Sequence, residues 1–119
     1  MNDYIWSLIQ SDLTLCPKGF NTETYRVYEA MATGSIPVIE DVSSKGKCDP
    51  RPWRLLKKYN PPVKWVKNWD NIGMLIRKDQ RRSLRSKIER RKEILKWYSF
   101  FKNEIKKEFL NVVEKKLIS

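Results

Sequence analysis

One stretch of the sequence, residues 11–42, constrains the fold more than any other. Residues 13–16 are apolar and partly β-branched, and a Pro/Gly pair then interrupts them, so we predict a short buried strand that ends in a tight loop. A helical segment follows and stops at Gly34, a residue type that suits the position after a helix C-terminus. Residues 36–39 predict a second buried strand. This order favours an α/β fold with a mostly parallel sheet.

The helix between the two strands is predicted to begin at Asn21 or Thr22, because either side chain can accept a hydrogen bond from a free backbone N–H. It runs to about Thr33. Pro37 conflicts with the second strand, because proline cannot donate to a strand ladder and favours strand starts or sheet edges.

The rest of the chain predicts further elements of the same class. We predict a loop at 43–52, two helical turns at 53–59, a strand at 63–66, a helix at 69–78 and a long amphipathic helix from Arg81 with room for one break. The apolar positions of that helix step by three, four or seven: Leu84, Ile88, Leu95, Tyr98, Phe101, Ile105, Phe109 and Val112. Three strands make a small sheet with exposed edges, so we expect a further part of the protein beyond this chain.

The chain is therefore predicted to consist of three parts. Residues 1–10 resemble the end of a preceding helix, residues 11–78 form an α/β core, and residues 79–119 form a long basic amphipathic C-terminal helix. Nothing in the first ten residues is typical of a signal peptide, and no apolar run approaches the length of a membrane span.

Composition excludes some classes and leaves others open. A hydrophobic content of 40% with five Trp excludes a disordered chain. The net charge of +11 is concentrated in residues 77–119, which hold 15 Lys and Arg against 6 Asp and Glu. That excess suits nucleic acid, an anionic membrane surface or a solvated helix face. No zinc-finger or RRM signature accompanies it, so we favour the solvated face and expect no nucleic-acid partner; a nucleic-acid-binding domain and a non-catalytic interaction module remain the alternatives.

Several residues have two readings. Cys16 and Cys48 can pair in a secretory compartment or stay reduced, and their spacing does not match a metal site. Trp53 suits either the core or an exposed platform for a sugar. The chain has no His, the commonest general base and metal ligand.

The start of the predicted helix has the features of an anion site. Free N–H groups and the positive end of the helix dipole follow the loop at 16–21, and Lys18 and Arg26 add charge for a diphosphate. Gly19 allows close approach of the backbone. On a helical wheel Thr22, Arg26, Glu29 and Thr33 share one stripe, so Glu29 can accept hydrogen bonds from ribose hydroxyls. The alternatives are a solvated surface stripe and a simple ion pair between Arg26 and Glu29.

Residues 15–30 and 34–42 resemble the C-terminal lobe of exostosin-like GT-B glycosyltransferases, whose pattern is an Arg, then Glu-Ala, then Gly-x-Ile-Pro-Val. Arg26, Glu29-Ala30 and the segment at 34–38 match it, and Pro37 belongs to that pattern. Residues 11–17, the Gly-x-Asn-Thr-Glu turn, 66–69 and 87–92 are similar to one family in particular, the ribitol-5-phosphate xylosyltransferases.

The resemblance implies a partial Rossmann-like lobe of a Golgi type II membrane enzyme. Such an enzyme transfers xylose from UDP-xylose to ribitol phosphate in the O-mannosyl glycan of α-dystroglycan, without a bound metal. By resemblance Arg26 faces the diphosphate, Glu29 faces the ribose, and Lys18, Gly19, Asn21 and Thr22 lie by the phosphates. The catalytic base is unknown and is expected from an N-terminal lobe, so this chain alone should be inactive and bind UDP weakly.

Overall fold

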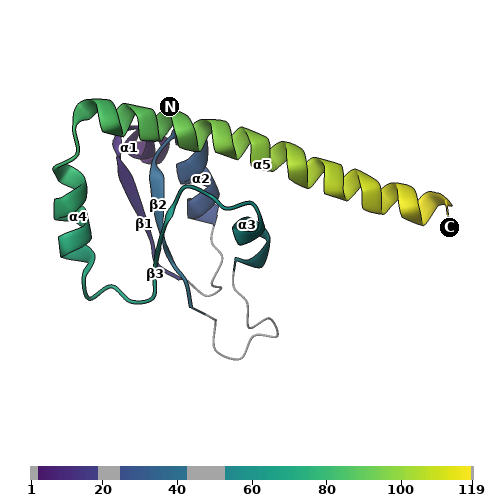
Figure 1. Cartoon of the computed structure of the whole chain (residues 1–119), viewed down its shortest axis with the longest axis horizontal. Helices are drawn as coiled ribbons and strands as arrows, with labels where there is room; N and C mark the ends of the chain where they lie inside the picture. Colours follow the sequence, from purple (N-terminus) through teal and green to yellow (C-terminus); the bar gives the residue numbers. More distant parts are fainter. Residues whose placement is uncertain (1–2, 19–24, 43–52, 119) are drawn as a thin grey trace.

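The computed structural model describes residues 3–18, 25–42 and 53–118. Within them, β1 (Leu13–Cys16), β2 (Ile36–Glu40) and β3 (Lys64–Val66) form a parallel sheet in the order β1-β2-β3 (Figure 1). The predicted α/β class and the parallel sheet are therefore confirmed.

Pro37 lies in the central strand without disturbing the sheet. Thr14 is its partner on β1, whereas β3 begins one residue later, with Lys64 opposite Val38. The backbone N–H of Ile36 donates toward β1, to the carbonyl of Asp12 at 3.0 Å. Successive N–H groups of a strand point to opposite sides, so the nitrogen of Pro37 faces the β3 side before the ladder starts there. No ladder hydrogen bond is lost, and the conflict seen in the sequence disappears.

Five helices accompany the sheet among the described residues, and they differ from the predicted ones mainly at their ends. They are α1 (Asp3–Gln10), α2 (Tyr25–Thr33), α3 (Arg54–Lys58), α4 (Ile72–Gln80) and α5 (Leu84–Ile118). The helix α4 begins three residues later than predicted, and α5 has no break. The predicted start of α2 at Asn21 or Thr22 and the predicted loop at 43–52 lie outside the described residues.

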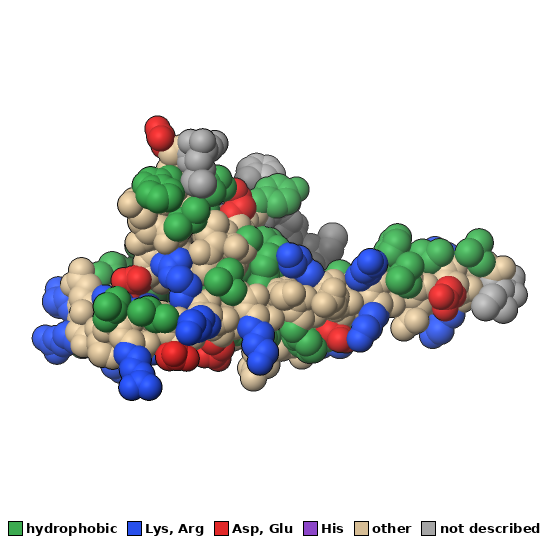
Figure 2. All heavy atoms as spheres, turned by 90° about the horizontal axis from the view of Figure 1, so that it is seen from above, with side chains coloured by type: hydrophobic (Ala, Val, Ile, Leu, Met, Phe, Trp, Pro, Cys, Tyr) green, Lys and Arg blue, Asp and Glu red, His purple; other side chains and the backbone are tan. Residues whose placement is uncertain are grey.

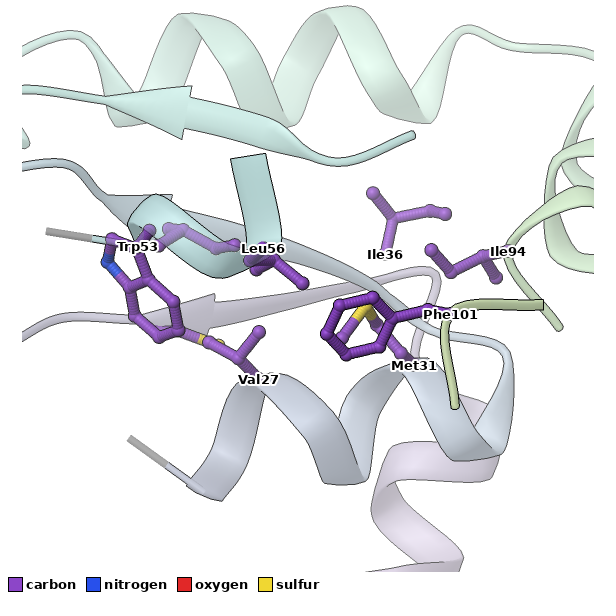
Figure 3. Packing of buried hydrophobic residues seen from close by; sticks show 9 residues of the cluster. Val27, Met31, Ile36, Trp53, Leu56, Ile94 and Phe101 are labelled. Atoms are coloured by element: carbon purple, nitrogen blue, oxygen red, sulfur yellow. The ribbon is translucent and has the colours of Figure 1, made fainter. Parts of the chain in front are cut away.

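The core joins α2, β2, α3 and α5 (Figure 3). Val27 and Met31 of α2 and Ile94 of α5 are fully buried, and Leu56 of α3 is almost so. Trp53, which precedes α3, is only 1% exposed, so this ring belongs to the core and does not offer a surface for a sugar. Burying these side chains is the main favourable contribution to folding.

The apolar stripe predicted along α5 is wrong over much of its length. Leu84, Phe109 and Val112 are more than half exposed, whereas Ile94, which was not on the stripe, is fully buried. The helix runs along the α/β body with its first half and then extends beyond it (Figure 1). Burial therefore follows the part of the helix that has a neighbour, and periodicity alone could not show where that part lies.

Basic residues of α5 attach the helix to the amino ends of the strands. The Arg91 guanidinium donates to the carbonyl of Thr33 at 3.0 Å and to the carbonyl of Ser11 at 2.9 Å. The Lys87 ammonium lies 3.3 Å from the carboxylate of Asp12. Part of the basic segment therefore holds the fold together, where the sequence predicted only a solvated face. The carboxyl ends of the strands point away from this part of α5, which does not cross them (Figure 1).

A buried hydroxyl pair joins β1 to the start of β2, and it yields a first prediction. The Oγ atoms of Thr14 and Ser35 lie 2.6 Å apart, and both residues are buried. Ser35→Ala should lower the free energy of unfolding by about 1–2 kcal/mol, because the Thr14 hydroxyl is left buried without this partner. Urea titration of both variants should show a smaller loss for Thr14→Val/Ser35→Ala, since no lone hydroxyl remains. An equal or larger loss in the double variant would contradict this account.

Candidate functional site

The three parallel strands end on the same side of the sheet, and this side is called its carboxyl edge here. The candidate site lies there, because ligands bind outside the carboxyl ends of the strands in open α/β folds. Lys18 follows β1 by two residues and is exposed, and Glu40 and Asp41 stand at the end of β2. Arg26 is in the first turn of α2 as the structure describes it, and it is also exposed.

The thiol of Cys16 shows where the charge of Arg26 acts. Burial raises the pKa of Cys16 to about 12, and the positive charge of Arg26 partly opposes that rise. The charge of Arg26, in the first described turn of α2, therefore reaches the thiol at the end of β1. Cys16 is a free, buried thiol that donates to the carbonyl of Thr14 at 3.4 Å. Cys48 lies outside the described residues, so its pairing stays a prediction.

Glu29 is half-buried between α2 and α1. Its carboxylate accepts a hydrogen bond from the hydroxyl of Tyr4 at 3.4 Å, and in the described structure it forms no ion pair with Arg26. The alternative of a simple Arg26–Glu29 pair is therefore not what this structure shows. Thr33, the last member of the polar stripe, turns its hydroxyl back to the carbonyl of Ala30 at 2.9 Å, so it closes the helix.

The two carboxylates at the end of β2 already have partners in the protein. The Lys57 ammonium lies 2.8 Å from each carboxylate oxygen of Asp41 and 5.1 Å from the centre of the Trp65 ring. Glu40 accepts a hydrogen bond from the indole N–H of Trp69. No pattern in the sequence predicts these contacts, which join residues 16 and 29 positions apart. They fix the end of β2 and its neighbouring segments around the site.

The described residues bring Lys18 and Arg26 to one edge, with Glu29 further along α2. Gly19, Asn21 and Thr22, the other predicted site residues, lie outside the described part of the chain, so their place at the phosphates stays a prediction. Within the described ranges no group of three His, Cys, Asp or Glu side chains could hold a metal ion. None of the helices described there is long and apolar enough to cross a membrane.

Two comparisons with known proteins agree on the family. The family model described as the RXYLT1 C-terminal domain matches residues 1–118. Ribitol-5-phosphate xylosyltransferase 1 of Homo sapiens is 46% identical over 120 residues, which cover 96% of this chain and 27% of that protein. The protein of the same name from Danio rerio is 44% identical over 114 residues, which cover 93% of this chain and 26% of that protein. No solved structure matches the chain significantly.

The chain thus spans about a quarter of the length of these curated relatives. The match runs through the strand–helix–strand unit and the long C-terminal helix alike, because it covers nearly all of the chain. On this evidence the chain belongs to the ribitol-5-phosphate xylosyltransferase family, as its C-terminal domain.

Proposed function

We propose that this chain is the donor-binding part of a GT-B-type xylosyltransferase and holds UDP-xylose at the carboxyl edge of its sheet. The names of the relatives support a xylosyltransferase, and the parallel α/β core supports a partial Rossmann-like lobe. The single observation that carries the proposal is the position of Arg26. Arg26 lies in the first described turn of α2, which packs on β1 and β2, and its charge reaches the thiol that ends β1; the amino end of a helix and the carboxyl end of a strand together favour an anion.

In this proposal each site residue has one task. Arg26 pairs with the diphosphate, and Lys18 adds a second charge beside the turn of Gly19, Asn21 and Thr22. Glu29 accepts hydrogen bonds from the ribose hydroxyls. A carboxylate accepts several hydrogen bonds, so the one from Tyr4 leaves room for a ribose and also orients the group.

The transfer itself requires more than this chain supplies. We propose that the full-length enzyme is anchored in the Golgi membrane, works on its lumenal side without a metal cofactor, and adds xylose to ribitol phosphate in the O-mannosyl glycan of α-dystroglycan. A catalytic base would come from the N-terminal lobe. The 119-residue chain alone should therefore bind UDP and transfer no xylose.

Binding of UDP to site variants tests the proposal. Arg26→Gln and Glu29→Gln should each weaken UDP binding by about tenfold, because each removes one charge-assisted contact to the ligand. Isothermal titration calorimetry on the 119-residue chain measures the change. Arg85→Gln removes a charge from an exposed position of α5 and serves as the matched control, which should leave the affinity unchanged.

Titration with uridine, which carries the ribose but no phosphate, separates the two tasks. Arg26→Gln should weaken UDP more than uridine, whereas Glu29→Gln should weaken both, since both carry the ribose. Unchanged UDP affinity in both variants, with intact far-UV circular dichroism, would remove the donor site from this edge.

A further inference from the structure

A second charged surface lies beside β3, the outer strand on the far side of the sheet from β1, and α4 forms its other wall. A groove of about 1200 Å³ follows the exposed edge of β3. We name it the basic groove, and its lining includes six cations: Lys64, Lys67, Arg77, Lys78, Arg81 and Arg82. Figure 2 shows Lys and Arg side chains gathered at the end of the molecule that α4 and the start of α5 form. We propose that this groove binds the phosphate group of the acceptor, an inference that rests on the proposed xylosyltransferase function.

Asp79 attracts Lys64 and Arg82 electrostatically, but none of the six cations forms an ion pair within the described structure. Other basic side chains do form ion pairs there: Lys57 with Asp41, Lys58 with Glu108 and Lys87 with Asp12. None of the six is part of such a pair in the described ranges. A concave surface that concentrates cations attracts anions to its interior.

The one acid of the groove is already neutralised. Asp79 is bound by both terminal nitrogens of the Arg90 guanidinium, the second at 3.1 Å, and both side chains are at most 10% exposed. Lys64 lies deeper than a typical surface lysine, and its pKa is lowered by burial first and by the charge of Arg90 second. A bound anion would offset both effects at Lys64.

The groove also has an apolar wall, which Val66, Ile72, Met74 and Leu75 contribute. This wall suits the carbon chain of a polyol phosphate, and the Lys and Arg side chains of the lining can supply charged donors for the phosphate oxygens. The groove reaches Lys67 and Asn68, directly after the carboxyl end of β3. The carboxyl end of the groove therefore opens on the side of the sheet where the donor is proposed to bind, as an acceptor site must, while Lys64 and Arg82 lie at its far end, beside the amino end of β3.

The donor phosphates are a second source of the same chemistry. The proposed donor site lies at β1 and α2, and β3 is two strands away across the sheet, about 10 Å at the usual strand spacing. A diphosphate held by Arg26 would be too far from Lys64 and Arg82 to use both sets of cations. We therefore assign the basic groove to the acceptor.

Amide NMR of the 119-residue chain, labelled with nitrogen-15, tests the assignment with three probes: ribitol 5-phosphate, UDP and inorganic phosphate. Ribitol 5-phosphate should shift amides at 64–82 and leave 25–29 unchanged, and inorganic phosphate should shift the same amides at higher concentration. UDP should shift 16–18 and 25–29. Lys64→Gln/Arg82→Gln should weaken ribitol 5-phosphate binding by about tenfold or more, since two charge-assisted contacts are lost.

Arg85→Gln, one turn from Arg82 and outside the groove lining, should bind ribitol 5-phosphate like the parent chain. Two outcomes would overturn the groove assignment: no shift at 64–82 with ribitol 5-phosphate, or equal shifts there with UDP. If UDP shifts the donor edge in either case, the proposed function stands and only the acceptor site is lost. Shifts at 64–82 with ribitol 5-phosphate but none anywhere with UDP would support the phosphate site and remove the donor assignment.

Discussion

Gly34→Ala should lower the free energy of unfolding by about 2–4 kcal/mol, through backbone strain and a steric clash together. Gly34 ends α2 with a φ of +87°, in the left-handed region that residues with a side chain rarely adopt. A Cβ at this position would also lie 2.6 Å from Cγ of Arg91. Chemical denaturation in urea, followed by circular dichroism, measures the loss.

The clash matters because Arg91 cannot simply move away. The atom that Cβ would meet is in the middle of the side chain, whose end donates to the carbonyls of Thr33 and Ser11. Moving the side chain would break the hydrogen bonds that tie α5 to α2 and β1. The substitution should therefore loosen α5 as well as strain the end of α2.

Gly73→Ala is the matched control. Gly73 lies in the first turn of α4, has no positive φ, and a Cβ there would make ordinary contacts, the nearest at 3.5 Å. Alanine at that position should leave the stability unchanged or raise it by up to about 0.5 kcal/mol, because glycine is the poorer helix former but the position is at the helix start. Arg91→Ala separates strain from clash, since Gly34→Ala should cost less when Arg91 is already absent. Equal losses with and without Arg91 would leave backbone strain as the whole cause.

Gly34 also illustrates how much of the fold could be predicted from the sequence. Its place as the terminator of α2 follows from local rules, and so do the two strands and the helix between them, because their patterns are complete within residues 11–42. The approach of Arg91 involves a residue 57 positions away and depends on how α5 crosses the sheet. The burial of Ile94 and the exposure of Phe109 depend on the same crossing, and for that reason the predicted stripe of α5 failed.

The candidate site divides in the same way. Helical spacing was enough to predict Arg26 and Glu29 on one stripe, and their roles at a donor remain a prediction. The hydroxyl of Tyr4 on Glu29, the pairing of Asp41 with Lys57 and the whole basic groove depend on contacts between distant segments. A sequence pattern shows which residues share a face of one element, and only the packing shows which other element that face meets.

The second large effect is expected at the buried ion pair between α4 and α5. Asp79 is 5% exposed and Arg90 10% exposed, as side chains, and the guanidinium binds both carboxylate oxygens. Asp79→Asn should lower the free energy of unfolding by about 3–5 kcal/mol, because Arg90 is left as a buried charge without its counter-charge. Asp79→Leu/Arg90→Met, which removes both charges, should cost far less or stabilise the protein.

The effect of Asp79→Asn should also depend on pH in a defined direction. Burial raises the pKa of Asp79, but the hydrogen bonds and the charge of Arg90 outweigh it and hold that pKa below its ordinary value of 3.8. The stabilisation by the carboxylate is therefore fully present above pH 3.8 and is lost as the pH falls through the lower, folded-state pKa. Urea titrations should show the parent chain and Asp79→Asn far apart at neutral pH and converging in acid. Asp70→Asn, at an exposed position in the loop before α4, is the control and should have the same free energy of unfolding as the parent chain at every pH. If the difference in unfolding free energy between Asp79→Asn and the parent stayed constant into acid, lost packing and not the lost charge would be the cause.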